Sequence, residues 1–134
     1  MFAKKTFTSL KELGQFGTKV FMSKAFEGVN VSGSIIMPGT LKELSVECFF
    51  KATVNTIDIP SSVTLIQGTC FMDSKIENLI FRSSTPPKLY GYWEFMRAQI
   101  GHIYVPDESV ELYKAEKWNY GQTLPFVPLS EYQG

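Results

Sequence analysis

The sequence predicts a solenoid of short parallel strands, in which a unit of 22 to 24 residues repeats and a short helix closes the C-terminal end. Two landmarks support this prediction. Five-residue segments of similar alternating pattern recur at 34–38, 56–60, 78–82 and 102–106. A phenylalanine recurs in step with them, at Phe26, Phe49, Phe71 and Phe95. One unit buries too little apolar surface to fold alone, whereas stacked units share a core.

Each repeated segment is expected to form a strand whose alternate residues face the core. The inward residues would be Ile35, Met37, Ile57, Ile59, Leu79, Phe81, Ile103 and Val105. Proline ends three of the four segments, and it cannot donate to a strand ladder, so pairing should stop there. A further apolar pair follows each proline and should turn inward on the opposite side of the coil, as Leu41 with Leu44 and Val63 with Ile66, with Leu10 and Leu13 as the first copy.

The residue before each phenylalanine is small in three units, where it is Ala25, Cys48 or Cys70, and is Glu94 in the fourth. Equivalent positions of adjacent coils lie about 5 Å apart, which is within reach of a disulfide between the two cysteines. The alanine at the same position indicates that small size is the requirement, and this favours two buried free thiols.

The 134 residues fit a single domain. We expect an irregular first repeat at 1–33, regular repeats at 34–101, and the last strand with a C-terminal cap at 102–134. Residues 107–117 should form a helix whose N-terminus is capped by Asp107 or Ser109 and whose Val110 and Tyr113 face inward. Trp118 should plug the last coil, because the open end of a solenoid otherwise exposes its core.

Composition excludes several classes of function. Thirteen basic and 13 acidic residues give a formal net charge of zero, so we expect neither nucleic-acid nor membrane-surface binding. The apolar runs are too short to span a bilayer, and the first ten residues lack the apolar stretch of a signal peptide. The single histidine, His102, falls at an outward strand position, and no catalytic triad, phosphate loop or metal motif is visible. We therefore predict a protein that is not an enzyme and has no metal or cofactor.

The unit at 57–71 resembles the BspA-like, or Treponema-type, leucine-rich repeat, from its Ile57, Ile59 and Pro60 to its Cys70-Phe71 pair. Residues 103–118 are similar to the segment that closes such arrays. The sequence departs from the pattern at Arg82, where proline is usual, and at Glu94, where a small residue is usual. The resemblance implies a leucine-rich-repeat solenoid and a role in binding.

Similar repeats occur in large surface and secreted proteins of gut and oral anaerobes and in phages of gut Bacteroides. The resemblance therefore implies a protein-binding or adhesion module at the cell surface or secreted, whose partner is a host protein or another bacterial surface protein. The alternative is a virion protein, in the tail or capsid, that contacts a neighbouring subunit or the host. The missing signal peptide favours the virion if Met1 is the natural start, and a fragment of a surface protein otherwise.

Two surfaces are candidates for partner binding. The outward strand column Ile36, Asp58, Ile80 and Tyr104 is mostly apolar and should be exposed, which suggests partner contact or self-association. The alternative is that it packs on a neighbouring domain or is merely tolerated. Replacing Ile36, Ile80 and Tyr104 by serine should then abolish association and spare the fold.

The second candidate is an aromatic loop. Tyr90, Tyr92 and Trp93 fall in the longest unit, and exposed aromatic residues suit contact with a protein or a glycan. The alternative is that Trp93 packs in the core.

Overall fold

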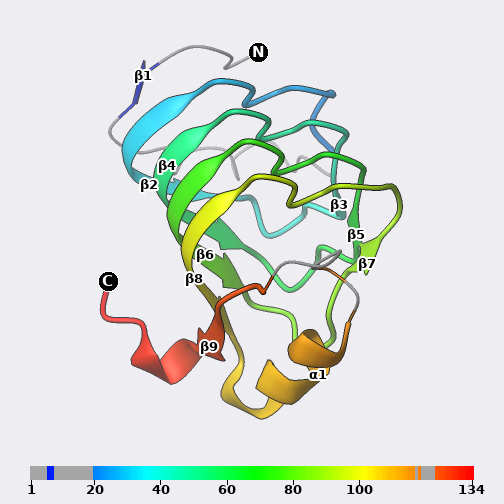
Figure 1. The fold of residues 1–134 in the computed structure, drawn as a ribbon, viewed down its shortest axis with the longest axis vertical. Coiled ribbons are helices and arrows are strands. Elements are labelled where there is room, and N and C mark those ends of the chain that lie inside the picture. Colours follow the sequence, from blue (N-terminus) through cyan, green and yellow to red (C-terminus); the bar gives the residue numbers. More distant parts are fainter. Residues whose placement is uncertain (1–5, 8–19, 117, 119–122) are drawn as a thin grey trace.

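The structure is a computed structural model that describes residues 6–7, 20–116, 118 and 123–134. It is a solenoid in which four long strands lie side by side and run parallel, β2 (Asn30–Ile36), β4 (Thr53–Ile59), β6 (Lys75–Phe81) and β8 (Gln99–Val105) (Figure 1). The short strands β1 (Thr6–Phe7) and β9 (Phe126–Pro128) extend this sheet at its two edges, so that its order is β1-β2-β4-β6-β8-β9.

The opposite side of each coil carries a second parallel sheet of two-residue strands, β3 (Glu43–Leu44), β5 (Leu65–Ile66) and β7 (Lys88–Leu89). The predicted apolar pairs Leu41 with Leu44 and Val63 with Ile66 are buried in this part of the coil. Their expected first copy, Leu10 and Leu13, lies outside the described residues. The leucine-rich-repeat solenoid is thus confirmed, and its repeats are mainly β.

The register of the long strands agrees with the sequence pattern. Ile35, Ile57, Leu79 and Ile103 pair in that order from strand to strand, and all eight predicted inward residues are buried. Each strand starts three or four residues earlier than the segments predicted, because its first part brings one more apolar residue inward. These residues are Val31, Val54, Ile76 and Ile100.

The repeated phenylalanines form a stacked column in the core. The ring centroids of Phe26 and Phe49 are 5.1 Å apart, those of Phe49 and Phe71 5.5 Å, and those of Phe71 and Phe95 5.1 Å, with the rings nearly parallel. Trp118 continues the column, since its ring stacks on Phe95 at 5.5 Å. The predicted plug in the last coil is therefore confirmed.

The turn around each phenylalanine has a left-handed backbone at two positions. One lies two residues before the phenylalanine, at Lys24, Glu47, Thr69 and Trp93, and the other two residues after it, at Gly28, Lys51, Asp73 and Arg97. Left-handed conformations cost non-glycine residues roughly 1–2 kcal/mol each. They persist here because alternate N–H groups of each turn donate to carbonyls of the next coil, as Glu47, Phe49 and Lys51 donate to Gly68, Cys70 and Met72.

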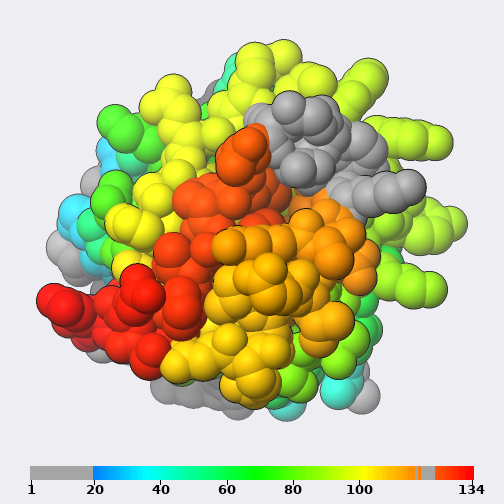
Figure 2. Space-filling model, turned by 60° about the horizontal axis from the view of Figure 1, so that its bottom comes forward, coloured from blue at the N-terminus to red at the C-terminus, as the bar shows by residue number. Residues whose placement is uncertain are grey.

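A C-terminal cap closes the last coil. It consists of a 3-10 turn (Asp107–Ser109), the helix α1 (Val110–Ala115), β9 and a final 3-10 turn (Leu129–Glu131), and Figure 2 shows it spread over this end of the molecule. Tyr113 is fully buried and Val110 packs against the core, as predicted. No helix in the described part of the chain is both long and apolar enough to span a membrane.

Ser109 occupies the N-cap position of α1, as one of the two expected capping residues, but neither its side chain nor that of Asp107 makes a capping hydrogen bond. The Asp107 carboxylate instead accepts a hydrogen bond from the N–H of Ser130, at 2.9 Å, and the Ser109 hydroxyl donates to the carbonyl of Ser84, at 2.7 Å. Both residues therefore tie the cap to other segments.

The column of aromatic rings predicts that Phe71→Ala destabilises the protein by about 3–5 kcal/mol, since the change leaves a cavity between two stacked rings. Urea denaturation followed by circular dichroism measures the loss. Tyr92→Ala, which removes an exposed ring, is the control and should change the free energy of unfolding by less than about 0.5 kcal/mol. Equal effects of the two changes would contradict the stacked core.

Cys48 and Cys70 are buried free thiols, and burial raises the pKa of Cys48 to about 12 and that of Cys70 well above its ordinary value. Because the thiolate is the reactive form, we expect neither thiol to react with a disulfide reagent such as DTNB in the native protein. Both should react after denaturation. Ser61→Cys supplies an exposed thiol as the positive control. Fast labelling of the native wild-type chain would contradict this prediction.

Candidate interaction surface

The outward strand column is only partly exposed. Strand pairing places Ile36, Asp58, Ile80 and Tyr104 at one level, as predicted, and Ile36 is 37% exposed. Ile80, however, is 1% exposed and Tyr104 is 7% exposed. The expectation of a continuous exposed apolar strip is therefore wrong.

The cause is the C-terminal segment and a coil-to-coil ion pair. Val127 of β9 pairs with Tyr104, and the ring of Tyr132 lies 5.0 Å from the ring of Tyr104. Asp58 is held by Arg82 in a two-point contact of 3.0 and 2.9 Å. Serine at the two buried positions would therefore disturb the fold, which corrects the expectation that the triple serine change spares it.

The aromatic loop, in contrast, lies at the surface. Tyr90 is 75% exposed, Tyr92 72% and Trp93 51%. The interpretation that Trp93 packs in the core is therefore wrong, because its backbone is left-handed, with φ of 60°, and the side chain of the next residue, Glu94, turns inward instead. Figure 2 shows yellow-green side chains of this part of the chain standing out from the molecule.

An additional residue in the loop explains its prominence. Ile66 pairs with Leu89, 23 residues later, whereas the N–H of Thr69 bonds the carbonyl of Tyr92, which puts Tyr92 level with Gly68, 24 residues earlier. The chain therefore holds one more residue just after β7. Glycine is needed at position 91 in this longer loop, since a Cβ there would lie 2.6 Å from the Cα of Gly68. The loop thus sits tightly on the preceding coil.

A row of half-buried apolar side chains adjoins this loop along the turns. Asp73 donates its N–H to the carbonyl of Met96, and Lys51 donates to that of Met72, so Phe50, Met72 and Met96 occupy equivalent positions in successive coils. We call Tyr90, Tyr92, Trp93, Met96, Met72 and Phe50 together the aromatic surface. Sequence reasoning missed the methionines, although their fixed place one residue after each phenylalanine was visible.

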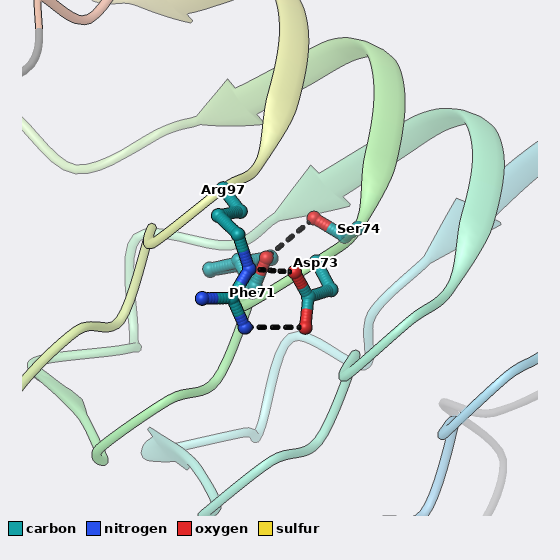
Figure 3. A network of polar contacts seen from close by, with 4 residues as sticks. All are labelled: Phe71, Asp73, Ser74 and Arg97. Carbon is teal, nitrogen blue, oxygen red and sulfur yellow. Dashed lines mark hydrogen bonds and ion pairs between the residues drawn. The ribbon is translucent and has the colours of Figure 1, made fainter.

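Charges beside the aromatic surface are neutralised in pairs. The Arg97 guanidinium contacts both oxygens of Asp73, at 2.6 and 3.0 Å, while the Ser74 hydroxyl donates to the carbonyl of Phe71 in the same turn (Figure 3). This contact lowers the pKa of the Asp73 carboxyl and raises that of Arg97. Lys24 and Glu47 form a similar pair, at 3.6 Å. The exception is Lys51, whose ammonium lies 5.2 Å from the centre of the Phe50 ring and forms no ion pair among the described residues. The surface therefore offers apolar contact with one positive charge at the edge formed by Phe50.

The described residues hold no group of three or more histidine, cysteine, aspartate or glutamate side chains that could bind a metal ion. His102 is exposed, as expected for an outward strand residue, and its ring lies 5.5 Å from that of Tyr104.

The BspA type leucine-rich repeat region matches residues 2–116, in six copies. The chain belongs to the BspA-type leucine-rich-repeat family. No match is found among curated proteins or among solved structures. Proteins of this family typically bind other proteins at a cell surface or in the secreted state.

The two departures from the BspA-type pattern have structural explanations. Arg82 replaces proline, and its N–H donates to the carbonyl of Ile59, a bond that proline cannot make, while its side chain pairs with Asp58. Glu94 replaces a small residue. Its Oε2 accepts a hydrogen bond from the N–H of Gly91, at 2.9 Å, so the carboxylate holds the aromatic loop from inside.

The buried Oε1 of Glu94 has no hydrogen-bond partner, and burial raises the pKa of this carboxyl above its ordinary 4.5. The folded chain thus binds this proton more tightly than the unfolded chain. The protonated Glu94 carboxyl therefore stabilises the fold fully at a pH below the ordinary pKa. This stabilisation is lost as the pH rises through the raised pKa of the folded chain.

We therefore predict that Glu94→Gln gains stability relative to the wild type between pH 4 and pH 7, because the variant has no charge to bury. Urea unfolding at both pH values measures the difference. Glu108→Gln, at an exposed position, is the control and should show no such pH-dependent gain. If the free energies of unfolding of Glu94→Gln and the wild type differ by the same amount at both pH values, the raised pKa of Glu94 is contradicted.

Proposed function

We propose that the chain is a non-catalytic module that binds a protein displayed on a cell surface, and that the aromatic surface makes the contact. The observation that supports this most directly is the exposure of Tyr90, Tyr92 and Trp93 on a loop that backbone contacts hold in place. Tyrosine and tryptophan are the side chains that most often dominate the energy of protein–protein contacts.

The chemistry of this surface suits a protein partner. Aromatic residues supply large contact area with few rotatable bonds, and methionine adapts to the shape of an apolar partner surface. Because Asp73 and Arg97 neutralise each other beside it, contact with a partner would leave neither of these two charges unpaired. The loop is already ordered by Glu94 and Gly91, so binding would lose little conformational entropy.

Membership of the BspA-type family supports an adhesion role at the cell surface or in the secreted state. Ile36 and Asp58 remain proposed contact residues, since both keep partial exposure, whereas Ile80 and Tyr104 would take part only through the residues that cover them. Self-association through the strand column and the virion alternative stay predictions, and no contact among the described residues favours either.

The test is binding of the fluorescently labelled chain to cultured intestinal epithelial cells and to bacterial cells. The variant changes Tyr90→Ser, Tyr92→Ser and Trp93→Asn together, with asparagine chosen because it tolerates the left-handed backbone of Trp93. We expect saturable binding of the wild type and a loss of about 100-fold or more for the variant, as several central aromatic contacts disappear.

Leu112→Ser is the matched control, because Leu112 is exposed on α1, outside the aromatic surface, and its removal should not change binding. Trypsin treatment of the cells should abolish wild-type binding if the partner is a protein. Binding that survives trypsin, or that the triple variant retains, would contradict the proposal.

A further inference from the structure

A polar groove crosses the first halves of the four long strands. It is an open depression with a volume of about 530 Å³, and two rows of residues from successive strands border it. The first row is Asn30, Thr53, Lys75 and Gln99, which pair in that order, and the second is Asn55, Glu77 and Gly101. Ser32 also lines the groove, but it lies where the register between β2 and β4 shifts, between Val31 and Ser34. The buried residues Val31, Val54 and Ile76 lie between the rows and point into the core.

The side chains that border the groove are unused within the described chain. Those of Ser32, Thr53, Glu77 and Gln99 make no hydrogen bond or ion pair there, and neither do those of Asn30 and Lys75. Asn55 accepts one hydrogen bond from the Thr56 hydroxyl, at 2.8 Å, which fixes its side chain and leaves its amide nitrogen available.

Elsewhere on the coils, polar side chains at neighbouring levels bond each other. Arg82 binds Asp58, Arg97 binds Asp73, Gln67 donates to Glu43 at 3.1 Å and Asn78 donates to Thr56 at 3.3 Å. The groove instead gathers several amide, hydroxyl and charged groups that remain turned toward solvent. Such groups are able to donate to and accept from a ligand.

The last coil leaves one end of the second row without a side chain of its own. A Cβ at Gly101 would lie 2.6 Å from the carbonyl oxygen of Glu77 and 3.0 Å from its carboxylate, so the Glu77 side chain occupies the space beside this glycine. The groove thus carries one positive and one negative side chain, Lys75 and Glu77, and no net charge.

The distance between successive side chains along each row determines which class of ligand fits the groove. Neighbouring strands lie about 4.8 Å apart, so the first row offers one amide, hydroxyl or charged group at this interval over four coils, and the second row offers such groups at Asn55 and Glu77. A pyranose unit in an extended, equatorially linked chain has nearly the same length and presents hydroxyl groups on both sides. We propose that this groove binds a linear, uncharged oligosaccharide of three or four units that lies along the solenoid axis.

An extended peptide fits this spacing less well. Its side chains on one face repeat at about 6.6 Å, which falls out of step with the coils. The backbone groups of the inner strands that the groove crosses already pair with their neighbours, so a peptide has no strand edge to extend here. The two classes of ligand therefore give different expectations.

The test is a titration of the ¹⁵N-labelled chain with cellotetraose, chitotetraose or xylotetraose, followed by NMR. At least one should cause saturable shifts at the amides of 53–55, 75–77 and 99–101. Maltotetraose contains the same sugar as cellotetraose in a curved linkage, so it should bind more weakly than cellotetraose if the latter binds. Asn55→Leu combined with Gln99→Leu should weaken binding about tenfold or more, because sugar hydroxyls lose their partners.

Gln133→Leu, at an exposed position outside the groove, is the matched control and should leave the titration unchanged. The triple change at Tyr90, Tyr92 and Trp93 should also leave it unchanged, which separates this proposal from the one for the aromatic surface. Absence of shifts with all three extended sugars would overturn the proposal. So would shifts confined to the aromatic loop, or equal binding of a Gly-Ser octapeptide at the same amides.

Discussion

The register between successive coils is the constraint on which the rest of the structure depends. Three hydrogen-bonded ladders maintain it: one along the long strands, one along the short strands β3, β5 and β7, and one through the turns around each phenylalanine. Because all three join the same neighbouring coils, a slip of one residue in the strands would turn core residues outward. The ring spacing of 5.5 Å between Phe49 and Phe71 follows from this register. Additional residues are placed where they leave the core register intact, in the loop after β7 and in a shift of register within β2 between Val31 and Ser34.

The same register explains much of the polar surface. Residues 22 to 24 positions apart come to lie side by side, so Asp58 meets Arg82 and Asp73 meets Arg97. Each pair is exposed at least in part and contributes little stability alone. Its structural effect is to neutralise the two charges locally, so that neither is left to pair with a ligand. Several polar side chains of the groove form no such pairs and remain available to a ligand.

The sequence predicted what depends on periodicity, which is the strand register, the inward column from Ile35 to Ile103, the stacked phenylalanines and Trp118 as the plug. It misjudged what depends on segments that break the repeat. Burial of Tyr104 requires Val127 and Tyr132, which follow no repeated pattern. Exposure of Trp93 depends on a left-handed backbone, which residue type did not reveal. The sequence did not predict the groove, because its residues lie just before the alternating segments at 34–38, 56–60, 78–82 and 102–106 from which the strands were predicted.

The C-terminal cap also decides which surfaces remain open to a partner. The cap pairs β9 with β8 and places Tyr132 against Tyr104, so it closes the end of the solenoid. It also shields Tyr104, the last residue of the outward strand column, from solvent. The aromatic loop and the end of the groove at 99–101 belong to the same coil, joined by the turn that carries Arg97. Backbone bonds from Asp73 and Gln99 to neighbouring coils fix this turn. Two chemically different surfaces are thus held on one rigid frame, and each can be altered without disturbing the core that positions both.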